Sequence, residues 1–490
     1  MPYDTPTRIR LEGMRNRLLV PIASLCLAGA AMAQTAVPQQ RWIDTIFASF
    51  NRKGTPGCAV GVIQKDVLTL ARGYGEADIR LHRPNTSQTA FYVASLSKQF
   101  TAMSVVLLAQ DGKLSLDDDI RRWVPEVPNL GKITIRQLLN HTSGLRDYYT
   151  LLGITGWRPN ELFTEQTLLD LVARQKALNF QPGDEFLYNN TGYALLGIVV
   201  RRASGVSLRE FAAARIFKPL GMTHTQFRDD HSTAIDGEAI GYLKQAGGYP
   251  VSIPQLDVVG DGGVFTTVED LARWDANLDS GQIGGKDGVT LLQTPGRLND
   301  GTVTGYALGL NVGSLNGARM VSHSGSYGGY QSTYLRFPDE HLSVITLCNV
   351  AVPSSRLAEE VASTFIPQYY TLGSGSLRVP SAVVGNPFLG VAGSRDVDSL
   401  AAELVRLDGR YYSDELDLEV TVRSDSPGLI MYRPVGDSLR FARTARDEFS
   451  TGDQILLHIE RDSAGAISSF LLSAGRVRGL RFVKRPDTTH

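Results

Sequence analysis

The chain has 490 residues, 42% of them hydrophobic and 20% charged, with a formal net charge of -1. This length allows roughly two to three domains, and the ordinary globular composition excludes a disordered chain or a coiled coil. Because the charge is balanced and Lys and Arg form no long run, we expect no nucleic-acid partner.

The N-terminus has the pattern of an export signal. Arg15 and Arg17 precede an apolar run over residues 18–31, and Ala33 completes a small-x-small cleavage site. We therefore expect residues 1–33 to be removed and the mature protein to be periplasmic or secreted. A stable membrane anchor is not expected, because the apolar run is short and contains a proline. Translation from the first methionine and from a later one are both open.

The next region, residues 34–370, has strand patterns at both ends and helical patterns between them. The strand-like runs cover residues 59–63, 67–73, 306–312, 320–323, 333–337 and 342–347, and helical patterns and turns fill residues 116–278. This order predicts one α/β domain, with a mixed sheet built from both ends of the region and covered by helices.

Two cysteines remain once the export signal is removed. Cys58 and Cys348 each lie in a strand-like apolar run. Two buried free thiols are the simpler interpretation, and a bridge between an N-terminal and a C-terminal strand is the alternative.

Ser95 and Lys98 are the first candidate catalytic residues. They lie three residues apart at the start of a helix predicted from Ser95 to near Gly112, so they share one face. Burial and the positive end of the helix dipole both favour a neutral amine, and a neutral lysine can take the proton of a serine nucleophile. Chance gives a chain of this length about one or two Ser-x-x-Lys matches. The interpretation therefore depends on further motifs.

Tyr188 and Asn190 form a second polar motif, in a loop that enters an apolar helix over residues 194–200. A phenol there can share the proton work of a lysine, and an amide can hold both the lysine and a substrate carbonyl. Seen alone, Tyr188 would be a half-buried packing residue and Asn190 a helix N-cap.

His323, Gly325 and Ser326 lie in a third motif that follows a strand-like run and is rich in small residues. Gly325 permits a substrate backbone to approach closely. His323 offers a hydrogen-bond donor that can carry positive charge near the reacting centre. A lone histidine is usually structural, but the two earlier motifs favour a catalytic role for this one.

The C-terminal part of the chain differs in character. Residues 371–403 are rich in Gly, Ser and Pro and are predicted to be a linker. Residues 404–490 contain short strand-like runs, among them 416–423, which alternates with period two. We find no nucleophile-and-base pair here, so a structural or substrate-gating role is favoured. The chain also shows no His-Glu-x-x-His cluster, and we expect no metal and no cofactor.

With these three motifs in this order, the chain resembles the serine β-lactamase-related hydrolases, a group that includes class C β-lactamases, D-aminopeptidases, DD-peptidases and esterases. The likeness covers roughly residues 42–365 and includes blocks at 133–145, 217–222 and 262–271. It implies a β-lactamase/transpeptidase-like fold with helices on both faces of the sheet and an all-helical region. Residues 404–490 resemble, more weakly, the lipocalin-like barrels attached to some of these hydrolases.

The resemblance also implies roles for the motif residues. It implies an acyl-enzyme on Ser95 and an oxyanion hole made by the backbone N–H groups of Ser95 and Ser326. The remaining roles are Lys98 and Tyr188 as general bases, Asn190 and His323 as polar contacts, and Gly325 and Ser326 as substrate-binding residues.

His323 stands where true β-lactamases usually carry lysine, so we expect weak or no β-lactamase activity. The predicted function is an exported serine hydrolase that cleaves amide or ester bonds of small substrates, with D-amino-acid peptides or amides as the first choice. The alternatives are a carboxylesterase of the same family and a non-catalytic β-lactam sensor or peptide-binding module. An α/β-hydrolase is disfavoured, because no Gly-x-Ser-x-Gly element occurs.

The substrate pocket is expected to be walled by loops over residues 146–181 and 237–261. Tyr148, Tyr149 and Trp157 in the first of these indicate an aromatic-lined approach, although loop aromatics are equally often packing residues. The oligomeric state is left open.

Overall fold

The structure is a computed structural model that describes residues 39–366, 403–452 and 454–486. The predicted export signal over residues 1–33 lies outside the described residues, as does nearly all of the predicted linker over 371–403. Among the described residues, no helix combines the length and the apolar character needed to cross a membrane.

The chain divides into two compact units. Met1–Thr45 forms one, and its described residues 39–45 are helical. Ile46–His490 forms the other and contains both the α/β domain and the C-terminal β module.

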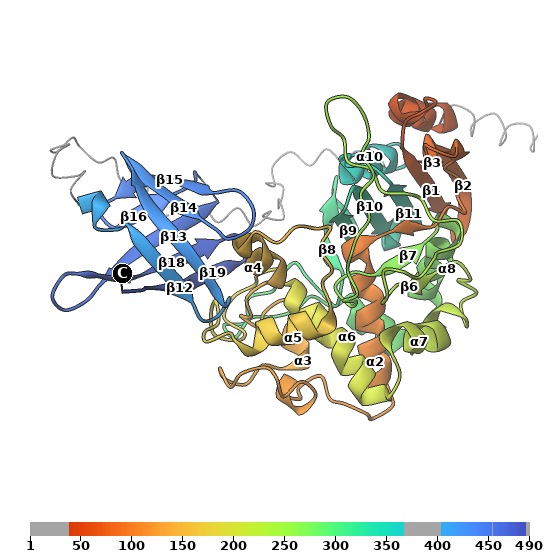
Figure 1. The fold of residues 1–490 in the computed structure, drawn as a ribbon. Helices are drawn as coiled ribbons and strands as arrows, with labels where there is room; N and C mark the ends of the chain where they lie inside the picture. The colour runs from red at the N-terminus through yellow and green to blue at the C-terminus, as the bar shows by residue number, and fades with distance from the viewer. Residues whose placement is uncertain (1–38, 367–402, 453, 487–490) are drawn as a thin grey trace, which may run out of the picture. The chain divides into compact units, whose positions relative to one another are not determined.

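A six-stranded sheet forms the centre of the α/β domain, in the order β2-β1-β11-β10-β9-β8 (Figure 1). Its strands are β1 (Cys58–Gln64), β2 (Val67–Tyr74), β8 (Asn311–Leu315), β9 (Ala318–Tyr327), β10 (Tyr330–Phe337) and β11 (Leu342–Cys348). Each neighbouring pair is antiparallel, which refines the mixed sheet expected from the sequence. The sheet joins strands from both ends of the domain, and the predicted fold class is confirmed.

Helices cover both faces of this sheet. Thr333 of β10 contacts Ser354, the first residue of α10 (Ser354–Ala362), through hydroxyl groups 2.8 Å apart. The next residue, Tyr334, donates a hydrogen bond to Asp275 of α8 (Val268–Ser280). Because successive strand residues face opposite sides, α8 and α10 lie on opposite faces.

Cys58 and Cys348 form a disulfide between the first and last strands of the sequence that enter the sheet. The two residues are directly opposite each other where β1 pairs with β11, and their Cα atoms are 4.0 Å apart. The simpler interpretation of two free thiols was therefore wrong, and the bridged alternative holds.

The helical region contains the second large group of elements. Its helices are α2 (Lys98–Gln110), α3 (Ile135–Leu139), α4 (Tyr148–Thr155), α5 (Glu165–Ala173), α6 (Asn190–Ser204), α7 (Leu208–Ala212) and α9 (Gly285–Leu292). Helix α2 is buried from Lys98 to Leu108, as its nearly continuous apolar sequence predicts. It packs against α6, so the first two polar motifs lie on neighbouring helices.

A short three-stranded sheet joins these layers next to Ser95. It consists of β5 (Phe91–Tyr92), β7 (Val264–Thr266) and β6 (Gln226–Phe227). Directly after β5, the N–H of Val93 donates to the carbonyl of Val264 over 2.9 Å. This pairing places the loop that precedes β7 beside the start of α2.

The C-terminal module is a closed barrel of eight antiparallel strands, which confirms the predicted all-β module. Its strands are β12 (Gly409–Ser413), β13 (Leu418–Asp425), β14 (Gly428–Tyr432), β15 (Leu439–Ala445), β16 (Glu448–Ser450), β17 (Ile455–Arg461), β18 (Ile467–Ala474) and β19 (Val477–Lys484). Buried aromatic rings fill its interior, with Phe470 5.0 Å from Tyr411 and 4.8 Å from Phe482 between ring centroids.

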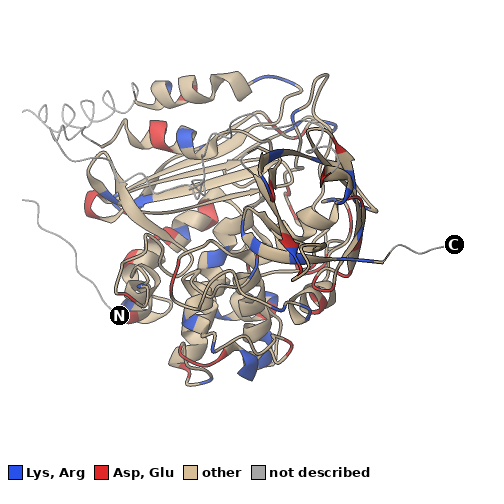
Figure 2. Cartoon of the chain, turned by 90° about the vertical axis from the view of Figure 1, so that its left-hand side faces the viewer, with Lys and Arg blue, Asp and Glu red and all other residues tan. Residues whose placement is uncertain are grey.

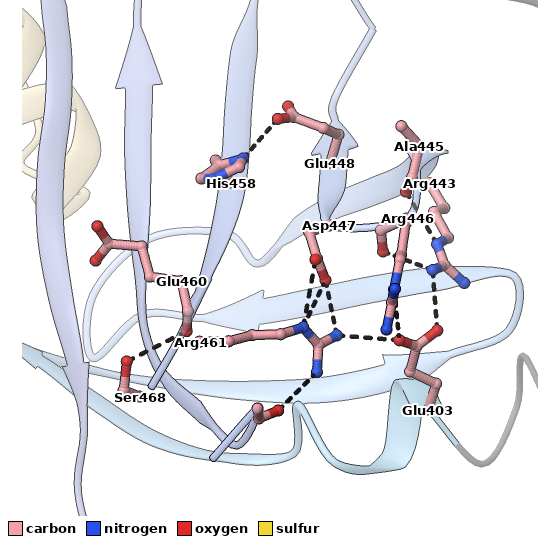
Figure 3. Close-up of polar contacts among 11 residues, drawn as sticks. Glu403, Arg443, Ala445, Arg446, Asp447, Glu448, His458, Glu460, Arg461 and Ser468 are labelled. Carbon is pink, nitrogen blue, oxygen red and sulfur yellow. Dashed lines mark hydrogen bonds and ion pairs between the residues drawn. The ribbon is translucent and has the colours of Figure 1, made fainter. Parts of the chain in front are cut away.

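An ion network on the barrel joins Glu403, which precedes β12, to residues of β15 and β17. The Glu403 carboxylate accepts hydrogen bonds from Arg443 over 3.1 Å and from Arg461 over 3.0 Å (Figure 3). Arg461 also binds Asp447 over 2.7 Å. Elsewhere, Figure 2 shows basic and acidic residues interspersed along the elements, as expected for a chain with balanced charge.

Candidate active site

Ser95 lies on a short 3-10 turn, η2 (Ala94–Ser97), immediately before α2 begins at Lys98. The sequence predicted that the helix itself starts at Ser95. The difference arises because Ala94 adopts a left-handed φ of 47°, which makes the chain turn sharply after β5. Ser332 of β10 fixes this turn by donating its hydroxyl to the carbonyl of Val93 over 2.7 Å. The serine is therefore presented at a sharp bend instead of along a helix face.

The Lys98 amine lies at the centre of the first two motifs. Its Nζ is 3.0 Å from Ser95 Oγ and 2.9 Å from Asn190 Oδ1. A third contact, of 2.7 Å, joins it to the backbone carbonyl of Asp261. A neutral amine keeps two hydrogens, which the two carbonyl oxygens can accept, and its lone pair then faces the Ser95 hydroxyl.

The surroundings of Lys98 favour this neutral form. Burial lowers the pKa of Lys98 from 10.5 to about 7, and the positive charge of Arg476 acts in the same direction. The carboxylates of Asp261 and Asp147 act in the opposite direction. A large fraction of the lysine is therefore unprotonated near neutral pH, in line with the sequence prediction of a lysine base.

Tyr188 and Asn190 are placed by the start of α6. Asn189 caps this helix, because its Oδ1 accepts the N–H of Gly192 over 2.7 Å, and Asn190 is the first helical residue. The N-cap role considered for Asn190 therefore belongs to its neighbour, which leaves the Asn190 amide for Lys98. The Tyr188 ring centroid is 4.9 Å from Lys98 Nζ.

The Tyr188 hydroxyl is buried and has no hydrogen-bond partner among the described residues. Burial raises the pKa of Tyr188, while the nearby Ser95 side chain and the charge of Arg476 lower it. The phenol is thus neutral at pH 7 and suits a proton relay better than a phenolate base. Buried polar atoms normally have partners, and the one side chain within reach of this hydroxyl that affects its pKa through a hydrogen bond is that of Ser95.

His323 lies on β9 near the side chains of the first two motifs, and its imidazole is neutral. Its Nδ1–H donates to the carbonyl of Ser324 over 2.7 Å, so Nε2 can accept the hydroxyl of Tyr306 over 3.0 Å. Burial lowers the pKa of His323 to about 3, and the charge of Lys98 contributes. This shift disfavours, at neutral pH, the positive charge that the sequence allows for His323. Its ring lies 6.2 Å from that of Tyr188.

Gly325 is needed for the contact between β9 and the Ser95 turn. A Cβ atom at this position would lie 2.1 Å from the carbonyl oxygen of Val93 and 3.0 Å from the backbone nitrogen of Ser95. A backbone segment therefore does approach Gly325 closely, as the sequence predicted. It is the protein's own backbone at Ser95, however, and not that of a substrate. Ser326 is the exposed second-to-last residue of β9, and its hydroxyl accepts a hydrogen bond from Gln331 Nε2 over 2.6 Å.

Asp261 is a site residue that sequence reasoning missed. Its carboxylate accepts a hydrogen bond from the buried Tyr148 hydroxyl over 3.0 Å. Burial raises the pKa of Asp261, and the positive charge of Lys98 opposes that shift. The residue directly precedes the block at 262–271, but nothing in the sequence distinguishes it from a surface loop acid.

His141 was also missed as a site residue, although it lies in the block at 133–145. Its ring centroid is 4.3 Å from that of Tyr188 and 4.4 Å from that of Tyr306. Its Nδ1 accepts the N–H of Asn189 over 3.1 Å, and burial holds the pKa of His141 well below its usual range. This neutral imidazole packs behind the second motif.

The predicted loop aromatics lie close to this group. Tyr148 is fully buried and stacks on Tyr149, with ring centroids 4.3 Å apart. Tyr149 also contacts Tyr327 of β9 over 5.7 Å. Trp157 packs against Phe163 over 6.1 Å. Tyr149 and Tyr327 therefore extend an aromatic surface beside the third motif, whereas Tyr148 and Trp157 are packing residues.

The barrel also contributes to this region. Arg476 lies in the turn between β18 and β19, and its guanidinium carbon is 5.6 Å from the centroid of the Tyr188 ring. It forms an ion pair of 3.1 Å with Asp147, which precedes α4. Nearby, the buried Arg146 guanidinium pairs with Glu415 of the barrel.

Two other features lie apart from the motif residues. A cavity of about 270 Å³ is lined by apolar residues such as Ile198 and Leu208 together with charged ones that include Glu165, Arg201 and Asp257, but by none of the motif residues. Asp230, His231 and Asp257 are, within the described ranges, the one group spaced to hold a metal ion. The N–H and Nδ1 of His231 already bind the same Asp257 oxygen, over 2.7 and 2.9 Å.

Comparison with known proteins identifies the family. Residues 40–363 match the protein family described as Beta-lactamase. Penicillin-binding protein 4* of Bacillus subtilis is 31% identical over 326 residues, which cover 64% of this chain and 72% of that protein. The chain therefore belongs to the β-lactamase family and is a serine hydrolase of the group that includes penicillin-binding proteins, which confirms the resemblance.

Two further proteins are similar to this chain, one in sequence and one in structure. A D-aminopeptidase of Brucella anthropi is 29% identical over 309 residues, covering 63% of this chain and 58% of its own length. The crystal structure of a penicillin-binding protein from Bacillus halodurans superposes with a TM-score of 0.58 at 26% identity, covering 66% of this chain and 99% of that one.

Proposed function

We propose that this protein is an exported serine hydrolase that forms an acyl-enzyme on Ser95 and cleaves D-amino-acid peptides or amides. The observation that carries the proposal is the 3.0 Å contact between Ser95 Oγ and the amine of Lys98. Because burial lowers the pKa of Lys98 to about 7, this amine is available as a base at neutral pH.

Acylation would proceed as follows. Neutral Lys98 takes the hydroxyl proton of Ser95 while Oγ attacks the substrate carbonyl carbon. The oxyanion is held by the backbone N–H groups of Ser95 and Ser326. The bond to the leaving amine then breaks, and that amine takes a proton relayed from Lys98 through the neutral phenol of Tyr188.

Deacylation would use the same groups in reverse. Water attacks the acyl carbon and gives its proton to Lys98, the bond to Ser95 Oγ breaks, and the serine regains a proton. Asn190 holds the amine in place through both halves of the reaction, since its side-chain oxygen accepts a Lys98 hydrogen over 2.9 Å. The neutral imidazole of His323 would act as a fixed polar contact, held by Tyr306, and not as a charged anchor.

The substrate class is supported by the family and by the third motif. A relative at 29% identity is a D-aminopeptidase. A neutral His323 does not supply the permanent positive charge of a lysine, which argues for weak or no β-lactamase activity. The disulfide between Cys58 and Cys348 supports export, because such bonds persist in oxidising compartments.

The proposal is tested with purified protein and four kinds of acyl donor: D-aminoacyl nitroanilides, their L-enantiomers, short-chain nitrophenyl esters and a fluorescent penicillin. We expect turnover of the D-substrates and an adduct on Ser95 in the intact mass. Ser95→Ala should abolish both. Ser97→Ala is the matched control, because this hydroxyl accepts the N–H of Val264 and lies outside the proton path.

If only the esters are turned over, the substrate is a carboxylic ester and not a D-amino-acid peptide or amide. An absence of any Ser95 adduct with all four donors would refute the enzyme proposal and leave a peptide- or β-lactam-binding module.

A further inference from the structure

The turn between β18 and β19 is fixed against the α/β domain by hydrogen bonds between its backbone and the side chain of Asn179. The carbonyl of Arg476 accepts the side-chain amide of Asn179 over 2.9 Å. The oxygen of the same amide accepts the N–H of Arg478 over 2.8 Å. Asn179 therefore binds the turn on both sides of Val477. These contacts hold the backbone of the turn and do not involve the Arg476 side chain.

The Arg476 side chain points from this turn toward the first two motifs. Its Nη2 is 3.1 Å from Asp147 Oδ1, and its guanidinium lies over the Tyr188 ring. The Asp147 side chain is completely buried, whereas that of Arg476 is 30% exposed. Asp147 Oδ1 also accepts the N–H of Thr150 over 3.1 Å, and the barrel adds an opposite charge that stabilises this buried carboxylate.

Asp147 connects this contact to the lysine. Its second oxygen, Oδ2, accepts the backbone N–H of Asn190 over 2.7 Å. The Asn190 side chain in turn accepts a hydrogen from Lys98. Three consecutive contacts thus lead from the barrel to the amine beside Ser95.

We propose that Arg476 is a positioning residue for the Ser95 site, so that the barrel helps to hold the catalytic groups of the hydrolase in place. Its guanidinium neutralises and orients Asp147, which fixes Asn190 and, through it, the amine of Lys98. Its contact with the Tyr188 ring fixes the second side of the same amine. This proposal rests on the proposed function, because it concerns the proton path of that reaction.

The charges around Lys98 determine the direction of the expected effect. Arg476 lowers the pKa of Lys98, and Asp147 and Asp261 raise it. Removing the guanidinium leaves Asp147 uncompensated, so the amine should hold its proton to higher pH. The titratable groups that face Lys98 in the described part of the chain are Asp261, Asp147, Arg476, Tyr188, Tyr193, His141 and His323.

The test measures the rate of Ser95 acylation by a nitrophenyl ester from pH 5 to pH 9 in the full chain. In Arg476→Met, we expect the acid limb of the profile to move up by about one pH unit, with about tenfold slower acylation at pH 6. Arg476→Lys, which keeps the charge, should restore the limb at least in part.

Arg478→Met is the matched control. This residue lies two positions away on β19, and its side chain pairs with the exposed Glu185. We expect its profile to coincide with that of the wild type.

The proposal is overturned if the wild type acylates and the acid limb of Arg476→Met coincides with that of Arg478→Met. A wild type that forms no Ser95 adduct with any of the four acyl donors named above would instead refute the proposed function. Should Arg476→Met fail to fold, as judged by near-UV circular dichroism, Arg476→Gln takes its place under the same two criteria. Arg476→Gln keeps a polar side chain at the turn but removes the charge.

Discussion

Asp261 contacts Lys98 in two opposing ways: its backbone carbonyl accepts a hydrogen from the amine over 2.7 Å, and its negative charge favours the protonated ammonium. The carboxylate is held away from solvent and bonded to Tyr148. The backbone contact places the amine, and the charge of the side chain raises the pKa of Lys98 against the larger lowering by burial.

We therefore predict that Asp261→Asn shifts the acid limb of the acylation profile to lower pH. The substitution keeps the backbone carbonyl but removes a charge that raises the pKa of Lys98. Stopped-flow acylation between pH 4 and pH 8 measures the shift. An unchanged limb, or one that moves upward, would contradict this role for Asp261.

A second prediction concerns the stability of the fold. The pKa of Lys98 is about 7 in the folded protein, and the ordinary lysine pKa of 10.5 applies in the unfolded chain. Between these values the unfolded chain binds one more proton, so the free energy of unfolding should rise with pH by about 1.4 kcal/mol per unit from this group. Below pH 7 both states are charged and this contribution to the slope disappears.

Urea unfolding at pH 7, 8 and 9 tests the stability prediction. Lys98→Met should lose this part of the pH dependence, whereas Lys113→Met, at an exposed position after α2, should keep it. Equal slopes in the wild type and in Lys98→Met would show that the buried amine is charged in the folded state.

Gly325→Ala should damage the site directly. The added Cβ would lie 2.1 Å from the Val93 carbonyl, so β9 and the Ser95 turn must separate. We expect acylation to fall about 100-fold and the free energy of unfolding to fall by about 1–3 kcal/mol. Gly153→Ala in α4, where a Cβ meets nothing within 4 Å, is the control and should leave acylation unchanged. Normal acylation in Gly325→Ala would mean that the turn tolerates displacement.

The disulfide gives a fourth prediction. Thiol titration of the unreduced, denatured protein lacking residues 1–33 should find no free thiol. The double substitution Cys58→Ser and Cys348→Ser should lower the free energy of unfolding by about 2–5 kcal/mol, measured in guanidinium chloride. Two titratable thiols in the wild type would refute the bridge.

The positions of the motif residues could be predicted from the sequence because their elements are strongly patterned. The apolar run after Lys98 indicates a buried helix, and Gly325 follows a strand-like run. Spacing alone therefore places a hydroxyl and an amine on one turn. The closed barrel was likewise predictable as a β module from its alternating strands.

The environment of these residues could not be predicted in the same way. The neutral state of His323 depends on Tyr306 and on burial by distant segments. Asp261 and Arg476 reach Lys98 only through tertiary packing, across 163 residues for the first contact. The disulfide depends on a strand register that pairs residues separated by 290 positions. Such contacts have no local signature.

The disulfide between Cys58 and Cys348 closes a covalent ring, and the positions of Ser95 and His323 fall inside it. The ring also contains a loop with exposed apolar side chains, among them Val251 and Ile253. A protease that cuts this loop once opens the ring without releasing either half. The cut protein would keep both the nucleophile and the third motif on one molecule, so a single cut would not separate the parts of the site.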